Sequence, residues 1–285
     1  MTDISRKELE SLVSFEAQEA LVVSALKSAF ESPVGRVRFL GRYTSWNGFF
    51  GSGVATLAGK IGRSRGAFLD PNEPIRAIAD RSVYVASFFF DAARDEFDDR
   101  DTVHRDTHRC LAQSTLKGML DFEREHGDEV LQSATRINAL LNEPEWLNAL
   151  NARVARGYGS RTADDAGSIF HAIGYHLGSE LLADREFSLI DETLRGSAPE
   201  LTAYLQSTSV DVAGQSHVAY QWVGIHSGHG GAAEADHFAW ATQGVKLAFR
   251  FVPSAQHIAL KTQLHAGFRA FAEDHREFFE RVNLD

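Results

Sequence analysis

The sequence has little sulfur and little proline: its 285 residues include one cysteine, two methionines and six prolines. The single cysteine, Cys110, excludes an intramolecular disulfide and predicts a reducing, cytoplasmic location. No uninterrupted apolar stretch reaches the roughly 18 to 20 residues of a bilayer span. The first residues, MTDISRKELESLV, alternate charged with apolar side chains and lack the apolar core of a signal peptide.

Positive charge is also scarce, because 29 Lys and Arg face 39 Asp and Glu, which gives a net charge of -10 with neutral histidine. Phosphate binding requires a basic face, so this balance argues against nucleic acid and against an anionic membrane as partners. A hydrophobic fraction of 44% and a charged fraction of 24% are those of an ordinary globular protein. What remains is an acidic globular chain, long enough to bury a sizeable core.

The stretches between the prolines carry apolar residues at helical spacing, and no strand hairpin, β-α-β alternation or repeat is recognisable. We therefore predict a single all-α domain of about nine to eleven helices over residues 1–285. It divides into N-terminal helices over 1–70, a helical core over 71–250 that carries the candidate metal ligands, and a C-terminal helix over 251–285.

One helix is predicted to begin at Asp70-Pro71 and to run to Glu96, because aspartate followed by proline is typical of an N-cap and first turn. The run Phe88–Phe90 makes this helix apolar on all sides, so we expect it in the core. The clearest loop is GYGSRTADD, residues 157–165. Further helices are expected at about 103–125, 128–141, 144–156, 166–184, 186–195, 232–250 and 254–282, with another that begins at Pro199.

Histidine is abundant, with twelve residues, and it combines with carboxylates in three otherwise apolar segments. The residues concerned are Asp95, Glu96, His104 and His108 in the first segment, His171, His176 and Glu180 in the second, and His226, His229, Glu234, Asp236 and His237 in the third. Imidazole and carboxylate without thiolate favour iron or manganese over structural zinc. Three carboxylates with three histidines would suit a two-iron centre.

Spacing supports ligand roles for some of these residues. Glu234 and His237 are three residues apart, so both side chains leave a helix on one face, as in helical bundles that bind metals. Glu180 stands between Leu177 and Leu181 on an apolar helix, where burial of a bare carboxylate would cost several kcal/mol. That carboxylate must therefore be solvated, paired or bound to metal.

The ordered set resembles the haem-oxygenase-like di-iron oxidases and oxygenases over roughly residues 80–250. DEF…H…L resembles the family's first ligand helix pair, SELLADREF its middle glutamate helix, and IHSGHGGAAEADHF its last ligand helix. The resemblance implies a helical bundle of the haem-oxygenase type that binds two Fe(II) ions, with dioxygen as co-substrate. It implies oxidation of a small amine, amino acid or fatty acid, often in natural-product biosynthesis, with an external electron donor as a further partner. By position, the implied metal ligands are Glu96, His108, Glu180, His226, Glu234 and His237.

The last helix departs from the family's order of His-xxx-carboxylate-xx-His, which would place its first histidine at Gly230. The nearest histidines are His229, one residue away, and His226, four residues away. Both remain open as the fourth ligand.

Other positions have alternates. His104 is the alternate to His108, which is favoured because an apolar run follows it. Asp236 is a further alternate, although helical spacing turns it away from the ligand face. His176 precedes Glu180 by four residues and is either a ligand or a hydrogen-bond partner of that carboxylate.

Two other readings use the same architecture. Cys110 would be the nucleophile of a cofactor-free, thiaminase-like helical hydrolase, with His108 the nearest base along the chain. A small-molecule-binding or scaffold protein would leave the histidines without a metal role. A haem oxygenase is disfavoured, because its proximal histidine lies near the N-terminus and residues 1–103 contain none.

The remaining histidines of the last helix, His257, His265 and His275, are expected at the surface. The first helix is amphipathic and offers a face for a second copy of the chain, so a homodimer is compatible with the sequence.

Overall fold

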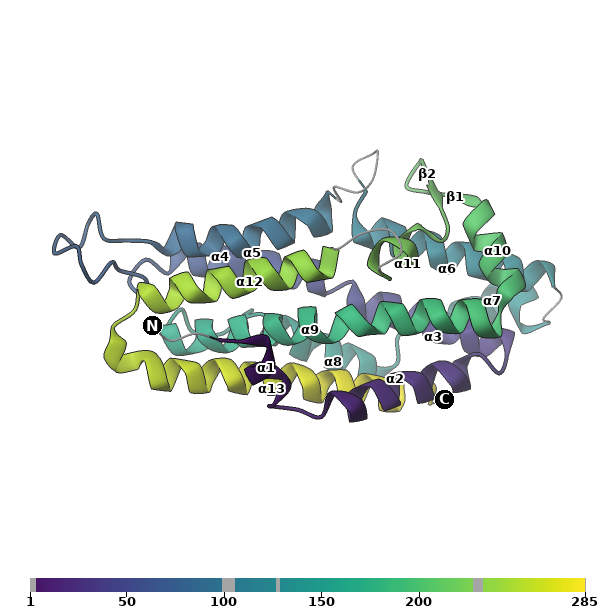
Figure 1. Ribbon diagram of the computed structural model, residues 1–285. Coiled ribbons are helices and arrows are strands. Elements are labelled where there is room, and N and C mark those ends of the chain that lie inside the picture. Colours follow the sequence, from purple (N-terminus) through teal and green to yellow (C-terminus); the bar gives the residue numbers. More distant parts are fainter. Residues whose placement is uncertain (1–3, 99–105, 127–128, 228–232, 285) are drawn as a thin grey trace.

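A 32-residue helix, α9, runs through the middle of the molecule and carries the central predicted ligand, Glu180 (Figure 1). In the computed structural model the described residues are 4–98, 106–126, 129–227 and 233–284, with the backbone alone described at 184 and 233–236. The α-helices are α1 (Arg6–Glu10), α2 (Phe15–Ala29), α3 (Pro33–Asn47), α4 (Phe50–Arg63), α5 (Ser82–Phe97), α6 (His108–Glu125), α7 (Ala134–Leu141), α8 (Glu145–Gly157), α9 (Ala166–Ser197), α10 (Pro199–Ser207), α11 (Gln221–His226), α12 (Ala233–Arg250) and α13 (His257–Arg281). Two 3-10 turns, Val130–Gln132 and Ser254–Gln256, and two strands, β1 (Ser209–Val212) and β2 (Gln215–Val218), complete the described elements.

The fold is therefore all-α, as predicted from the periodicity. The described residues form more α-helices than the expected nine to eleven, partly because the short segments α1 and α11 are separate helices. Helices α4, α5 and α12 cover one end of α9, and α6, α10 and α11 cover the other, while α2 and α13 lie on its opposite side (Figure 1). The ends of four of these covering helices consequently meet over the middle of α9.

Helices α9 and α13 approach one another closely through two glycines. A Cβ atom at Gly174 would lie 1.8 Å from the carbonyl oxygen of Leu264, and one at Gly267 would lie 1.9 Å from that of His171. Neither position can accept a side chain unless the backbones separate. This contact holds α9 directly against α13.

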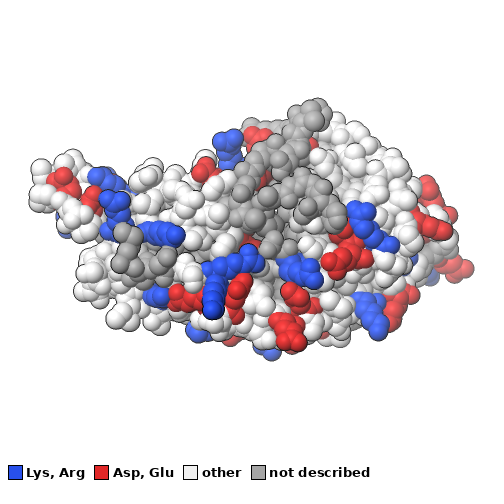
Figure 2. Space-filling model, in the orientation of Figure 1, with Lys and Arg blue, Asp and Glu red and all other residues white. Residues whose placement is uncertain are grey.

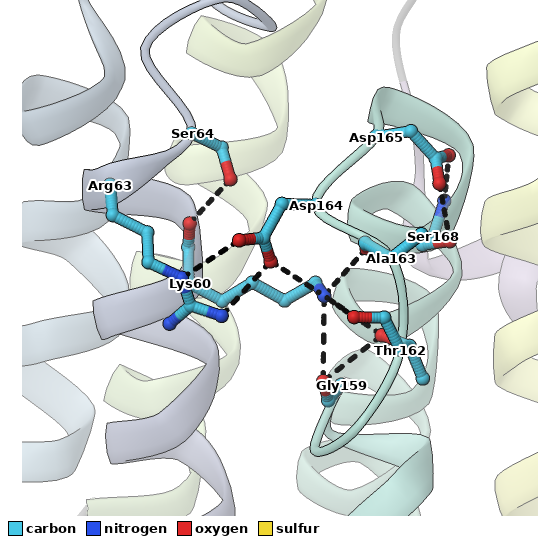
Figure 3. Close-up of polar contacts among 9 residues, drawn as sticks. All are labelled: Lys60, Arg63, Ser64, Gly159, Thr162, Ala163, Asp164, Asp165 and Ser168. Carbon is cyan, nitrogen blue, oxygen red and sulfur yellow. Dashed lines mark hydrogen bonds and ion pairs between the residues drawn. The ribbon is translucent and has the colours of Figure 1, made fainter.

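The predicted loop at 157–165 is tied down by a buried lysine from α4 (Figure 3). The side chain of Lys60 is 0% exposed. Its ammonium group donates to the carbonyl oxygens of Thr162 at 3.1 Å and Ala163 at 2.7 Å, to the Thr162 hydroxyl at 2.8 Å, and to the carboxylate of Asp164 at 3.2 Å. Because these acceptors replace water, the charge is buried without loss of hydrogen bonding.

The helix before the site begins later than predicted. Asp70 closes a local turn, in which its carboxylate accepts from the backbone N–H of Asn72 at 3.0 Å. Helix α5 begins instead at Ser82 after the N-cap Arg81, and the carboxylate of Asp80 accepts from the N–H of Ser82 at 2.9 Å. Helix α5 is also not buried on all sides, since Val83 is 71% and Phe90 60% exposed.

Two further expectations are wrong. The stretches 166–184 and 186–195 form one continuous helix, because no glycine or proline interrupts them between Gly178 and Gly196. A hairpin is present although none was expected: β1 and β2 pair antiparallel, with Val212 opposite Gln215. Ala213 and Gly214, with φ values of 56° and 82°, form its two-residue turn.

The two signs of charge are mixed on the surface. On the face shown in Figure 2, Lys and Arg side chains alternate with Asp and Glu side chains along the lower half of the molecule. Within the described ranges, no helix is both long and apolar enough to cross a membrane.

Candidate metal centre

Five of the six predicted ligands lie where five helices meet. Glu96 is in the last turn of α5, His108 is the first residue of α6, Glu180 lies in the middle of α9, His226 ends α11, and His237 lies near the start of α12. The side chains of His108, Glu180, His226 and His237 are buried, and that of Glu96 is 19% exposed. Four of these side chains lie near helix ends and that of Glu180 lies in the middle of a helix, and together they place polar groups in the apolar interior.

One group of side chains is formed by Glu96, His108 and His226. The Oε2 atom of Glu96 lies 3.2 Å from Nδ1 of His108. The rings of His108 and His226 are 4.6 Å apart and nearly perpendicular. Burial opposes ionisation of Glu96, but the neighbouring imidazoles of His108, His237 and His226 outweigh it and lower its pKa to about 2. Burial and the charge of His108 lower the pKa of His226 to about 3, so this imidazole is neutral and able to bind a metal.

A second group is centred on Glu180. Its Oε1 atom lies 3.2 Å from Nδ1 of His176, and its Oε2 atom lies 3.4 Å from Nδ1 of His237. His237 is held in turn by Asp95, whose Oδ2 atom lies 2.9 Å from Nε2. Burial opposes ionisation of Glu180, but His176 and His237 lower its pKa below the ordinary value. The carboxylate is therefore paired rather than bare, as its apolar helix requires.

The two groups form one electrostatic cluster. The charge of His237 contributes to the lower pKa of Glu96. The charge of Glu96 opposes the lowering of the pKa values of Glu180 and His176. Asp95 and Glu96 are consecutive residues, and each belongs to a different group. The last turn of α5 therefore links the two halves of the cluster.

Two of the histidines have their tautomers fixed by hydrogen bonds. Nδ1 of His226 donates to the carbonyl oxygen of Trp222 at 2.7 Å, which leaves the lone pair on Nε2. Nε2 of His237 faces the carboxylate of Asp95, so Nδ1, which faces Glu180, would be the nitrogen available to a metal. A histidine that donates one N–H to a carbonyl or carboxylate while the other nitrogen binds metal is the usual arrangement in metal sites.

Aromatic packing holds the far side of the His226 ring. Phe187 from α9 stacks on it with 4.4 Å between ring centres, and Trp222 packs edge-on against Phe187 at 5.2 Å. Since Trp222 is 1% exposed, water does not reach the cluster from this side.

Two glycines, Gly48 at the end of α3 and Gly51 in the first turn of α4, make room for the site. A Cβ atom at Gly51 would lie 3.0 Å from both Cβ and Oε2 of Glu96. A Cβ atom at Gly48 would overlap the guanidinium of Arg109, the residue after His108. These two glycines therefore allow close approach to α5 and α6.

Several candidates lie outside this cluster or outside the described residues. His171 faces a surface cleft that it shares with Arg153 and Tyr175. His104 and His229 fall outside the described ranges, as do the side chains of Glu234 and Asp236. The choice between Glu234 and Asp236 therefore stays a prediction, whereas His226 lies within the cluster.

The sequence missed a second buried pair, formed by Glu186 and His275. Their Oε1 and Nε2 atoms are 3.0 Å apart, and both side chains are 1% exposed. His275 was expected at the surface, but Nδ1 faces the amide oxygen of Gln18 at 2.7 Å and the Tyr43 hydroxyl donates to Glu186 at 2.7 Å. These fixed partners make the pair part of the core, and it serves below as an internal control.

The donor types in the cluster are those that iron accepts. The cluster contains the carboxylates of Glu96 and Glu180 and the imidazoles of His108, His226 and His237, and Asp95 is bonded to His237. Within the described part of the chain, no group of three or more His, Cys, Asp or Glu side chains is arranged to hold a metal ion. Nε2 of His176 is buried beside Glu180 without a hydrogen-bond partner among the described residues. A buried imidazole nitrogen without a hydrogen-bond partner is expected in a site that binds a metal ion or another ligand.

Comparison with protein-family models, with curated proteins and with solved structures finds no match to this chain.

Proposed function

We propose that this chain is a non-haem di-iron oxidase or oxygenase with a helical bundle of the haem-oxygenase-like type. The observation that carries the proposal is the convergence of buried carboxylates and imidazoles from five helices at the positions implied by the order of motifs. Buried ionisable groups that perturb one another's pKa values are typical of functional sites. A structural carboxylate has fixed partners from the core, as Glu186 has in His275 and Tyr43.

In this proposal each side chain has a defined task. Glu96 and His108 would be the first pair of ligands along the chain and Glu180 the middle carboxylate, while His226 and His237 would complete the set with Glu234. The carboxylates neutralise positive charge, and Asp95 keeps the His237 ring in place. When bound, two Fe(II) ions would supply the electrons for reduction of dioxygen at an open coordination position. Phe187 and Trp222 exclude water behind the site.

An anaerobic Fe(II) titration followed by exposure to air tests the proposal. We expect two irons per chain in the wild type and a transient visible absorption after oxygen is admitted. Glu180→Gln should lose iron and the absorption. Glu186→Gln is the matched control, since Glu186 lies on the same helix, is also buried and also faces a histidine. If reduced wild-type protein binds no iron, or if both variants lose it equally, the proposal fails.

The hydrolase alternative predicts a different response. Cys110 is half-buried in the first turn of α6, and its backbone N–H donates to the hydroxyl of Thr107 at 3.0 Å. A cysteine hydrolase would lose activity in Cys110→Ala and would be indifferent to chelators. The di-iron enzyme would keep its iron in Cys110→Ala and lose activity on chelation. A reducing cytoplasm, proposed here as the location, would favour both the free thiol and the Fe(II) state.

A further inference from the structure

A small pocket opens directly beside the first predicted ligand pair. It has a volume of about 330 Å³, and its walls come from the turn between α3 and α4, from the end of α5 and from the start of α6. Glu96 and His108 form part of these walls. Ligand pockets range from about 300 to 1,000 Å³, so this one suits a small molecule. Because the pocket opens beside the cluster, it gives a small molecule access to the candidate metal centre.

The wall next to His108 is positively charged. Arg109 lines the pocket, and its Nη1 atom donates to the carbonyl oxygen of Thr44. Among the described residues, Thr44 is the single acceptor bonded to this guanidinium. The edge formed by Nε and Nη2 is the one that binds a carboxylate through two parallel hydrogen bonds. Arg109 is thus anchored at one nitrogen while it lines the pocket.

The fold reinforces this charge in two ways. Arg109 lies in the first turn of α6, an 18-residue helix, and the N-terminal end of a helix attracts anions. Gly48 has no side chain where a Cβ atom would overlap the guanidinium, so the turn between α3 and α4 holds Arg109 in this place. Asn47 and Ser52 add uncharged polar groups to the same walls.

Two aromatic residues complete the walls. Phe49 and Phe97 face the pocket, and Phe97 is 47% exposed. Arg109 follows His108 directly in the chain, and Glu96 lines the same pocket. The cationic anchor and the predicted ligand pair are therefore within one small pocket.

From this arrangement we infer that the substrate of the site is a small organic acid, whose carboxylate binds Arg109 and whose apolar part lies between Phe49 and Phe97. The reacting carbon then lies on the side of Glu96 and His108. Binding of the acid rests on the pocket alone, and its oxidation rests on the proposed function. Arg109 and the α6 terminus oppose binding of a simple amine next to them, while the carboxylate of Glu96 is the negative charge among the residues that line the pocket.

Binding to chelator-treated, metal-free protein tests the inference without any iron chemistry. The probe is phenylacetate, with phenylacetamide and phenethylamine as neutral and cationic counterparts of similar size, measured by calorimetry and ligand-observed NMR. We expect phenylacetate to bind at least about tenfold more tightly than either counterpart, because only the acid makes charge-assisted hydrogen bonds. Equal binding of acid and amide would overturn the inference.

Variants locate the binding in the pocket. Arg109→Met should lower phenylacetate affinity by about tenfold or more, and Arg109→Lys should retain part of it because the positive charge remains. Arg76→Met is the control, since Arg76 lines a different cavity. Thermal unfolding and Fe(II) stoichiometry of each variant report on folding and on the metal site. Unchanged phenylacetate affinity in Arg109→Met would refute the assignment.

The two proposals can fail independently. If iron binds and the acid does not, the substrate class is wrong while the di-iron centre stands. If the acid binds in an Arg109-dependent manner and iron does not, the pocket is an organic-acid site and the di-iron proposal is wrong.

Discussion

Asp95 and His237 are joined across the interface of α5 and α12, with 2.9 Å between Oδ2 and Nε2. Both side chains are almost fully buried, at 5% and 1% exposure. The aspartate therefore orients the His237 ring, with Nε2 toward Asp95 and Nδ1 toward Glu180. Asp95 is adjacent to the predicted ligand Glu96, so a single turn of α5 both supplies a ligand and orients another.

This relationship predicts that Asp95→Asn weakens metal binding while the fold is retained. Loss of a hydrogen-bond partner behind a ligating histidine typically lowers metal affinity by about 10- to 100-fold. Competition of the protein with a coloured Fe(II) chelator measures the change. Asp191→Asn is the control, because Asp191 is also a buried aspartate, on α9, but is paired with Arg195 and Tyr220. Equal affinity in wild type and Asp95→Asn would show that Asp95 has no role at the metal.

A second prediction concerns the room that glycine leaves for Glu96. Gly51→Ala places a methyl group 3.0 Å from Oε2 of Glu96, so the carboxylate must move and Fe(II) affinity should fall. Gly59→Ala is the matched control on the same helix, since a Cβ atom there meets nothing within 4 Å. We expect Gly59→Ala to stabilise the fold by up to about 1 kcal/mol through helix propensity and to leave iron binding unchanged. Chemical denaturation and Fe(II) titration of both variants provide the comparison.

A third prediction concerns stability at a distance from the site. Lys60→Met removes the donor that satisfies the carbonyl groups of Thr162 and Ala163, and should lower the free energy of unfolding by about 2 to 5 kcal/mol. Arg63→Met should have a much smaller effect, because Arg63 pairs with the same Asp164 at the exposed surface. Urea denaturation distinguishes the two. A similar, small loss in both variants would mean that the loop does not depend on the buried ammonium group.

The helical fold was predictable because the apolar spacing and the prolines act locally. Pro33 and Pro199 stand at the first positions of α3 and α10. The start of α5 was not predictable from Asp70-Pro71, since the choice between two aspartates depends on a bridge between Leu69 and Asp80. The hairpin was missed because its turn contains alanine at positive φ, which local preference disfavours.

The candidate site was predictable in its residue types but not in its pairings. Glu180 had to be solvated, paired or bound to metal because its helix is apolar, and that argument needs no tertiary information. The role of Asp95 depends on the packing of α5 against α12, and the burial of His275 depends on Glu186 from α9. Periodicity alone made His275 look like a surface residue, because it does not show which helix face meets another helix.

A fourth prediction uses pH to test how α9, the helix that carries Glu180, begins. Asp165 is its N-cap, and the carboxylate accepts from the backbone N–H and the hydroxyl of Ser168, both at 2.9 Å. The bond from the Ser168 backbone is the largest cause of a pKa of Asp165 below its ordinary value of 3.8. A carboxyl group whose pKa is lower in the folded state stabilises the fold above its unfolded pKa, and this stabilisation is lost as the pH falls through the folded value.

Asp165→Ala should therefore lower the free energy of unfolding by about 1 kcal/mol at pH 7, and the difference from wild type should shrink as the pH falls below about 4. Ser32→Ala is the control, because the hydroxyl of Ser32 caps α3 by accepting from the N–H of Gly35 at 3.0 Å and does not titrate. The decrease in the free energy of unfolding caused by Ser32→Ala should stay constant over the same pH range. Urea denaturation between pH 7 and pH 3 measures both. A constant difference for Asp165→Ala would mean that the carboxylate charge adds nothing to the cap, and that the aspartate acts at this helix end as the uncharged serine does.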